Sequence, residues 1–156
     1  MNDPWPVIRS ATGMDAEPVL ELMAELGYPE LSRARFLETY REVLENPNMF
    51  LLVAEDEDHR LIALASLTSR PQLRLAGRLV NIDELVVADR VRGLGVGGRI
   101  LAAAQGMARQ LGARRLELET NRARESYRRR FYVKNGFLEA DSALMRIDYE
   151  FDSDSE

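Results

Sequence analysis

The stretch Arg90-Val-Arg-Gly-Leu-Gly-Val-Gly-Gly98 places four glycines within six positions of the chain. The segment before it ends in Leu85-Val-Val87 and is typical of a strand, whereas the apolar residues after it recur at helical spacing. Glycines let backbone N–H groups turn toward one point, and the start of a helix adds unpaired N–H groups and a positive dipole end. We therefore expect a strand, an anion-binding loop and a helix here, with Arg92 adding a charged side chain at the mouth of the loop.

The loop alone leaves the kind of anion open. Gly93-x-Gly95-x-x-Gly98 matches a dinucleotide-binding fingerprint. Glu117 and Glu119 lie near the ~20-residue spacing at which such sites carry a ribose-binding acid. In a dinucleotide-binding unit, however, the first glycine directly follows the strand, and here the residues 88–92 intervene. The ATP-binding Walker pattern is absent, because no Gly-Lys-Ser/Thr occurs in the sequence.

Charge is distributed unevenly along the chain, whose formal net charge is −5. Residues 90–134 carry 12 basic and 3 acidic side chains, whereas residues 1–89 carry 8 basic and 16 acidic ones. Of the 21 basic residues only Lys134 is not an arginine, the side chain whose planar guanidinium suits phosphate. The cationic middle of the chain therefore favours an anionic ligand, such as a phosphorylated cofactor or a nucleic acid.

Composition excludes several kinds of site. The 156 residues include no cysteine, which rules out disulfides, thiolate metal sites and a cysteine nucleophile. The one histidine, His59, lies in a charged turn and is given no catalytic role. No apolar run reaches the ~18 residues of a membrane span, and no signal-peptide pattern opens the sequence. We expect a cytoplasmic protein with a single domain over residues 1–151, followed by an acidic disordered tail at 152–156.

Strand and helix patterns alternate around the glycine loop. Thr12 with Asp15, and then Ser32, can cap two N-terminal helices, and a third helix follows the glycines. A short helix is expected over Glu125–Asn135 and a loop over Pro71–Gly77. The expected strands are Val7–Ser10, Met49–Ala54, Leu61–Ser69, Arg78–Val87, Arg115–Thr120 and Ala143–Phe151. This order implies an α/β domain with a mixed sheet.

Two motifs in this order resemble the GNAT superfamily of N-acetyltransferases. The family's acyl-CoA signature, Gln/Arg-x-x-Gly-x-Gly/Ala, is matched by Arg92-x-x-Gly95-x-Gly97. A second segment, a short helix ending Tyr-x-x-x-Gly-Phe, is matched by Tyr132-Val-Lys-Asn-Gly136-Phe137. The likeness covers roughly residues 7–150. It implies a GNAT-like mixed, mostly antiparallel central sheet of about six to seven strands, flanked by about four helices.

The resemblance also implies acetyl-CoA as the acyl-donor co-substrate, and no metal. The pantetheine arm would pair with the main chain of the strand before the loop, and Asn121 would contact the same arm. The strand residues are Leu85, Val86 and Val87. The pyrophosphate would lie over Arg92, Gly93, Leu94, Gly95, Val96, Gly97 and Gly98.

Acetyl transfer to an amine needs a proton acceptor, because a primary amine has a solution pKa near ~10.4. Asp83 and Glu84 lie on the strand that enters the site, and adjacent strand residues point to opposite faces. We therefore expect only one of them to face the substrate, and favour Glu84 as general base, with Asp83 and Glu119 as rivals. Tyr132 matches the family's general-acid tyrosine, and a packing role for its ring is the alternative.

The sequence thus predicts an acetyl-CoA-dependent N-acetyltransferase that acts on a primary amine of a small molecule or protein. The lack of cysteine excludes a cysteinyl acetyl-enzyme, so direct attack by the amine on the thioester is the simplest route. A non-catalytic acyl-CoA-binding or regulatory module is the alternative. Nucleic-acid binding by the arginines of residues 114–130 is disfavoured, because stacking aromatics other than Tyr127 are missing there. We expect no nucleic acid and no membrane as partner and, from the resemblance, a homodimer. The glutamates of the N-terminal helices would suit a cationic acceptor, and a solubilising helix face is the alternative interpretation of them.

Overall fold

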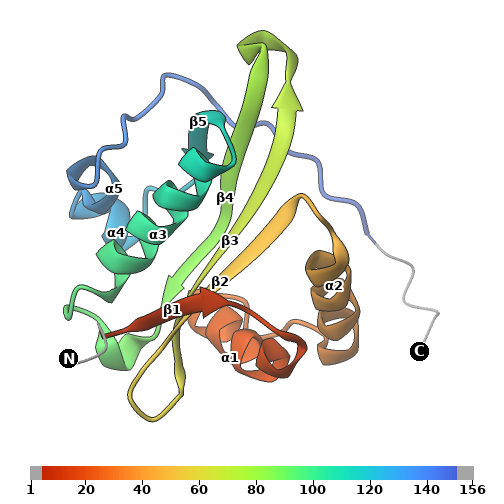
Figure 1. Ribbon diagram of the computed structural model, residues 1–156, viewed down its shortest axis with the longest axis vertical. Coiled ribbons are helices and arrows are strands. Elements are labelled where there is room, and N and C mark those ends of the chain that lie inside the picture. The colour runs from red at the N-terminus through yellow and green to blue at the C-terminus, as the bar shows by residue number, and fades with distance from the viewer. Residues whose placement is uncertain (1–4, 151–156) are drawn as a thin grey trace. The chain divides into compact units, whose positions relative to one another are not determined.

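The computed structural model describes residues 5–150 of the chain, which divides into two compact units, Met1–Asn121 and Arg122–Glu156. The first unit contains β1 Val7–Ser10, a 3₁₀ turn Gly13–Asp15, α1 Ala16–Leu26, α2 Arg33–Glu45, β2 Met49–Glu55, β3 Leu61–Gln72, a 3₁₀ turn Leu73–Leu75, β4 Gly77–Val87, a 3₁₀ turn Asp89–Val91, α3 Val96–Gln110 and β5 Ala113–Leu118 (Figure 1). The second unit contains α4 Glu125–Arg128 and α5 Phe131–Lys134. The expectation of one domain over residues 1–151 stays a prediction, and the expected tail at 152–156 lies outside the described residues.

The sheet of the first unit has the strand order β1-β2-β3-β4-β5. Neighbouring strands are antiparallel except for β4 and β5, which are parallel and are joined through α3. Helices α1 and α2 cover one face of the sheet and α3 covers the other (Figure 1). The central strand β3 is therefore buried on both faces, and no residue from Ile62 to Leu67 is more than 4% exposed.

Local sequence signals explain where the helices begin and end. Thr12 and Asp15 form the expected capping box, and Gly27 ends α1 with a φ of 120°. The Ser32 hydroxyl accepts a hydrogen bond from the backbone N–H of Arg35 at the start of α2, as expected. The buried face of α3 consists of Val96, Ile100, Leu101, Ala104 and Ala108.

Several expected elements differ from the observed ones. The strand expected at Arg115–Thr120 begins and ends two residues earlier, as β5. The loop expected at Pro71–Gly77 is shorter, because β3 continues through Gln72 and a 3₁₀ turn follows. The helix expected over Glu125–Asn135 is broken into α4 and α5, because Arg130 adopts the left-handed conformation with a φ of 60°.

The strand expected at Ala143–Phe151 is absent from the described residues, since positions 143–150 form no strand. The apolar side chains of Met145, Ile147 and Tyr149 in this segment are 87%, 76% and 81% exposed. The alternation of apolar and polar residues defines which side chains share a face, but a strand also needs a neighbouring strand to which it is hydrogen-bonded. The mixed, mostly antiparallel α/β fold is confirmed, but residues 5–150 contain five strands, fewer than the expected six to seven, and five α-helices where about four were expected.

Candidate active site

The glycine loop between β4 and α3 has the conformation expected of an anion site. Gly93 and Gly95 have φ values of 81° and 83°, which favour glycine, and a Cβ at either position would meet no atom within 4 Å. Gly95 is the N-cap of α3 and provides no side-chain hydrogen bond, while Gly97 and Gly98 lie in the first turn. The first N–H groups of α3 are therefore available to an external acceptor, in the positive field of the helix dipole.

The side chains of the loop have separate roles. Arg92 is exposed and forms an ion pair with Asp89, whose carboxylate lies 2.8 Å from a guanidinium nitrogen. Leu94 is 60% exposed, whereas Val96 is 1% exposed and packs into the core beneath the loop. The loop therefore presents backbone and one arginine outward while its buried valine fixes the start of α3.

Strand β4 is longer than its parallel neighbour. β5 pairs with β4 only from Arg78 to Ile82, whereas β4 continues to Val87. The residues Leu85, Val86 and Val87 pair with β3, and no strand in residues 5–150 covers their other edge. Two residues beyond the end of β5, the Thr120 hydroxyl is buried with no hydrogen-bond partner. A free strand edge and an orphaned hydroxyl are features that a ligand rich in amides could satisfy.

Asp83 and Glu84 lie on the same face of the sheet, which corrects the expectation that only one of them could face a substrate. The register between β3 and β4 shifts so that Ser66 pairs with Glu84 and Leu67 with Ile82, which leaves Asp83 as the extra residue of a β-bulge. The Glu84 carboxylate accepts a hydrogen bond from Ser66. The Asp83 carboxylate accepts one from Thr68, two residues further along β3 and on the same face as Ser66.

The two carboxylates of this bulge pair, Asp83 and Glu84, have neutral partners. Ser66 donates to Glu84 and Thr68 donates to Asp83, which also accepts a hydrogen bond of 2.8 Å from the Asn81 amide. Burial, reinforced by the neighbouring charge of Asp83, raises the pKa of Glu84 to about 6. Glu84 can therefore hold or release a proton near neutral pH. Its rival Glu119 is exposed and lies just after the end of β5.

Tyr132 belongs to α5 of the second unit and is partly buried. Its ring packs edge-on against Phe131 and Phe137, with centroid separations of 5.1 and 6.0 Å. The phenol of Tyr127, in α4, is already engaged, since it donates to the Glu139 carboxylate at 3.0 Å. Asn121 is the last residue of the first unit and is exposed.

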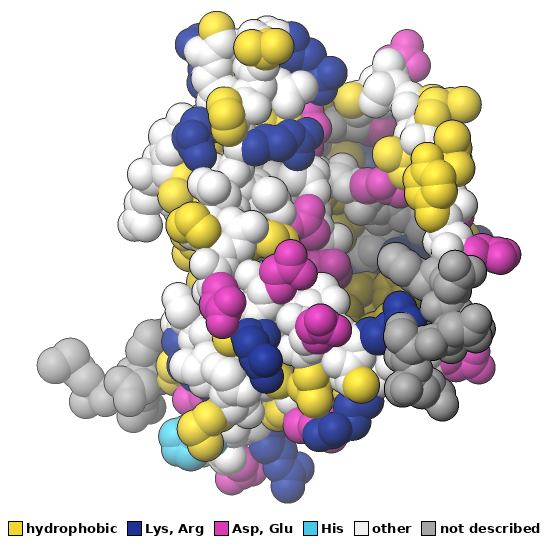
Figure 2. Space-filling model, turned by 90° about the vertical axis from the view of Figure 1, so that its right-hand side faces the viewer, with side chains coloured by type: hydrophobic (Ala, Val, Ile, Leu, Met, Phe, Trp, Pro, Cys, Tyr) yellow, Lys and Arg dark blue, Asp and Glu magenta, His cyan; other side chains and the backbone are white. Residues whose placement is uncertain are grey.

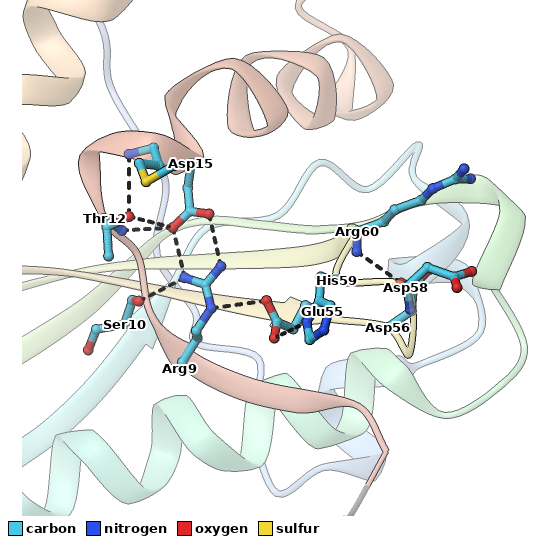
Figure 3. A network of polar contacts seen from close by, with 10 residues as sticks. Arg9, Ser10, Thr12, Asp15, Glu55, Asp56, Asp58, His59 and Arg60 are labelled. Atoms are coloured by element: carbon cyan, nitrogen blue, oxygen red, sulfur yellow. Dashed lines mark hydrogen bonds and ion pairs between the residues drawn. The ribbon is translucent and has the colours of Figure 1, made fainter.

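A second polar cluster was not anticipated from the sequence. This Arg9 cluster consists of Arg9, Asp15, Glu55 and His59 (Figure 3). The Arg9 guanidinium binds both oxygens of Asp15, at 2.8 and 2.9 Å, and Glu55 at 3.1 Å. His59 Nδ1 lies 3.2 Å from the other Glu55 oxygen. The capping pattern of Thr12 and Asp15 was visible in the sequence, but nothing there linked Asp15 to Arg9.

Both carboxylates of the Arg9 cluster are paired with the Arg9 guanidinium. The hydrogen bonds from Arg9 hold the pKa of Asp15 below its ordinary value, and those from His59 and Arg9 lower the pKa of Glu55. These residues line a hollow of about 840 Å³ beside α1. Because the cluster joins β1, β2 and the start of α1, its arrangement indicates a structural role.

The glutamates of α1 and α2 are exposed but do not form a single acidic patch. Figure 2 shows the face that carries α2, where acidic and basic side chains lie beside one another. Arg33 at the start of α2, for example, forms an ion pair with Glu17 of α1. Residues 5–150 contain no group of three acidic or histidine side chains suited to a metal ion. Within the same range, every helix is too short or too polar to cross a bilayer.

Comparison with known proteins identifies the family and the fold of the chain. Residues 16–137 match the acetyltransferase (GNAT) family. The aminoalkylphosphonate N-acetyltransferase of Salmonella typhimurium is 34% identical over 141 residues, which cover 89% of this chain and 90% of that protein. The crystal structure of a transcriptional regulator from Bacillus halodurans superimposes with a TM-score of 0.84 at 23% identity, covering 92% of this chain and 99% of that one. A putative acetyltransferase from Agrobacterium tumefaciens has a TM-score of 0.80 at 26% identity and covers 91% and 99% of the respective chains.

Proposed function

The chain is an N-acetyltransferase of the GNAT family, and from this premise we propose that it transfers the acetyl group of acetyl-CoA directly to a primary amine. The observation that carries the proposal is the pairing of two features on β4. The strand has a free edge at Leu85–Val87, and it leads into a glycine loop whose helix N-terminus has no side-chain cap. Such a surface offers hydrogen bonds to amides and then a positive pole to phosphates.

Acetyl-CoA, when bound, supplies an acetyl group activated as a thioester. The backbone N–H groups of Gly93–Gly98 and the Arg92 guanidinium would hold its pyrophosphate, and Arg92 would exchange Asp89 for phosphate. The main chain of Leu85, Val86 and Val87 would pair with the pantetheine amides. Asn121 would add a contact to the same arm, and the buried, unpartnered Thr120 hydroxyl supports a polar ligand close by.

Glu84 is proposed as the general base. At neutral pH an amine arrives as an ammonium ion, because its pKa lies near ~10.4, and the exposed charge of Asp83 attracts it. The carboxylate of Glu84 then accepts the proton, so that an N–H bond breaks and an O–H bond forms on Glu84. A pKa of about 6 leaves the carboxylate ionised at pH 7 yet able to hold a proton.

Tyr132 is proposed as the general acid, holding on its phenol oxygen the proton that the departing sulfur requires. Its ring is oriented by Phe131 and Phe137. Tyr132→Phe removes only the oxygen and keeps this packing. We expect kcat to fall by about 10²–10⁴-fold with unchanged acetyl-CoA affinity. Full activity of the variant would leave Tyr132 with a packing role.

The acceptor is proposed to be a small amine that is cationic at its reacting end. An aminoalkylphosphonate has such a group, and the enzyme of that name is 34% identical to this chain over most of its length. A polyamine and a lysine peptide serve as comparison substrates that lack the phosphonate.

We also propose a homodimer and a cytoplasmic location. The exposed side chains of Met145 and Ile147 support the homodimer. The absence of nucleic-acid and membrane partners stays a prediction.

The test follows release of free thiol from acetyl-CoA with this panel of amines. We expect amine-dependent release. Binding of acetyl-CoA without turnover would instead support the alternative of a non-catalytic acyl-CoA-binding module.

Gly95→Ala and Gly112→Ala form a matched pair at the two ends of α3, since both glycines have positive φ and open space at the Cβ position. Both should lose about 1–2 kcal/mol of stability, but only Gly95→Ala should raise the KM for acetyl-CoA. Equal KM values would contradict the proposed phosphate site.

A further inference from the structure

Ser66 is unusual among the residues of β3. Its neighbours Ala65 and Leu67 are fully buried, and Ser66 itself is only 4% exposed. A hydroxyl in such surroundings is costly unless it is hydrogen-bonded, and replacing it with alanine would remove that cost. A serine in the centre of the sheet therefore needs hydrogen-bond partners there.

Both hydrogen bonds of the Ser66 side chain go to one residue. Its oxygen accepts a hydrogen bond of 2.9 Å from the backbone N–H of Glu84, and its hydroxyl hydrogen is donated to the Glu84 carboxylate. The two residues are also paired in the β3–β4 register. One side chain thus fixes the main chain and the carboxylate of Glu84 together.

These bonds lie directly beside the β-bulge. The extra residue Asp83 loosens the ladder next to Glu84, because a bulge leaves one residue unpaired and bends its strand. Asp83 is held separately by Thr68 and Asn81. Without Ser66, the Glu84 side chain would lose this hydrogen bond beside the bulge of β4.

We propose that Ser66 is a positioning residue that holds the Glu84 carboxylate in place to receive the proton of the acceptor amine. This rests on the proposed function, in which Glu84 is the general base. Ser66 keeps its own proton in this role, because its hydroxyl acts toward the carboxylate as a hydrogen-bond donor. Its hydrogen bond favours the ionised form of Glu84, so its removal raises the pKa of that group.

The test measures the Glu84 carboxyl directly, by carbon-13 NMR titration of the protein without substrates. The resonance is identified by its loss in Glu84→Gln. Ser66→Ala should move the titration upward by about one pH unit, because a hydrogen bond to a charged group has about that effect. Ser66→Thr, which keeps the hydroxyl, should restore it. If Ser66→Ala does not fold, Ser66→Cys keeps a similar volume with a weak donor and provides the same comparison.

Ser69→Ala is the matched control. Ser69 is a second buried serine of β3, 3% exposed, and its hydroxyl accepts from Arg78 instead of contacting a carboxylate. The control should leave the Glu84 titration unchanged. An unchanged Glu84 titration in Ser66→Ala, or an equal shift in Ser69→Ala, would overturn the positioning role.

The pH dependence of kcat/KM for the amine separates this inference from the proposed function. If both hold, the kinetic pKa in Ser66→Ala moves with the NMR titration, kcat falls and the KM for acetyl-CoA is unchanged. If the NMR titration moves and the kinetic pKa does not, Ser66 controls Glu84 but Glu84 is not the base. The assignment of Glu84 as general base would then be wrong, whereas the effect of Ser66 on the Glu84 carboxylate would remain supported.

Discussion

The Arg9 cluster and the bulge pair both place carboxylates in the first unit, but they treat the charge in opposite ways. Asp15 and Glu55 face the guanidinium of Arg9, and hydrogen bonds lower the pKa of both. Asp83 and Glu84 face hydroxyl and amide groups, and burial raises the pKa of Glu84 to about 6. A carboxylate with a matched cation is held ionised, whereas one without a cation can exchange a proton near neutral pH. The first arrangement stabilises the fold and the second suits catalysis.

The largest contrast is expected in activity. Glu84→Gln should lower kcat/KM for the acceptor amine by about 10²–10⁴-fold, because the amide cannot accept the proton. Asp15→Asn should leave the activity of each folded molecule unchanged, since Asp15 belongs to the Arg9 cluster. The measurement is thiol release at pH 7, corrected for the folded fraction. Equal losses in the two variants would remove the distinction between the clusters.

Stability should show the opposite ranking. Arg9→Met leaves the carboxylate of Asp15, a residue only 6% exposed, without its cation. Breaking a buried pair costs about 3–5 kcal/mol, and we expect about 2–4 kcal/mol because the Arg9 side chain is 34% exposed. Denaturant unfolding measures the loss. The double variant Arg9→Met/Asp15→Asn should lose less unfolding free energy than Arg9→Met alone. If its loss equals the sum of the losses of the two single variants, Arg9 and Asp15 do not stabilise each other.

Glu84→Gln should stabilise the protein at pH 7–8. The folded-state pKa of Glu84 is raised from 4.5 to about 6, so ionisation opposes folding, and the penalty grows as pH rises through this window. A shift of this size corresponds to about 2 kcal/mol above pH 6. The gain should therefore vanish below pH 4.5, where Glu84 is protonated in both states. If Glu84→Gln is less stable than the natural sequence at pH 7, the claim that ionisation of Glu84 opposes folding is wrong.

Asp83→Asn should have the smallest effect of the four. It removes the like charge beside Glu84 and lowers the pKa of that group, opposite in sign to Ser66→Ala. Because burial is the larger cause of the raised pKa, we expect less than half of the shift to be lost. The carbon-13 titration of Glu84 detects this change. A rise in the Glu84 pKa would mean that Asp83 acts on Glu84 by a route other than charge.

Much of the framework could be predicted from local sequence signals. The glycines of the loop were informative because Gly93 and Gly95 need positive φ, and the capping box of Thr12 and Asp15 depends on residues three apart. Strands β1 to β4 followed from runs of apolar residues with turn signals between them. Each of these features is determined within a few residues of chain.

The decisive features of the site depend on residues that are distant in sequence. The bulge that turns Asp83 and Glu84 to one face arises from the pairing of β4 with β3, so alternation along β4 alone gave the wrong answer. Arg9 meets Glu55 across 46 residues. Alternation in residues 143–151 likewise described a face but could not supply a ladder partner.

The most direct test of the account is the pH dependence of kcat/KM for the acceptor amine, which reports the ionisation of the free enzyme. We predict that kcat/KM rises through about pH 6, as Glu84 ionises, and is then level until the amine itself loses its proton. In Glu84→Gln the rise near pH 6 should disappear. A profile without this rise in the natural sequence, or the same rise in Glu84→Gln, would contradict the assignment of Glu84 as the proton acceptor.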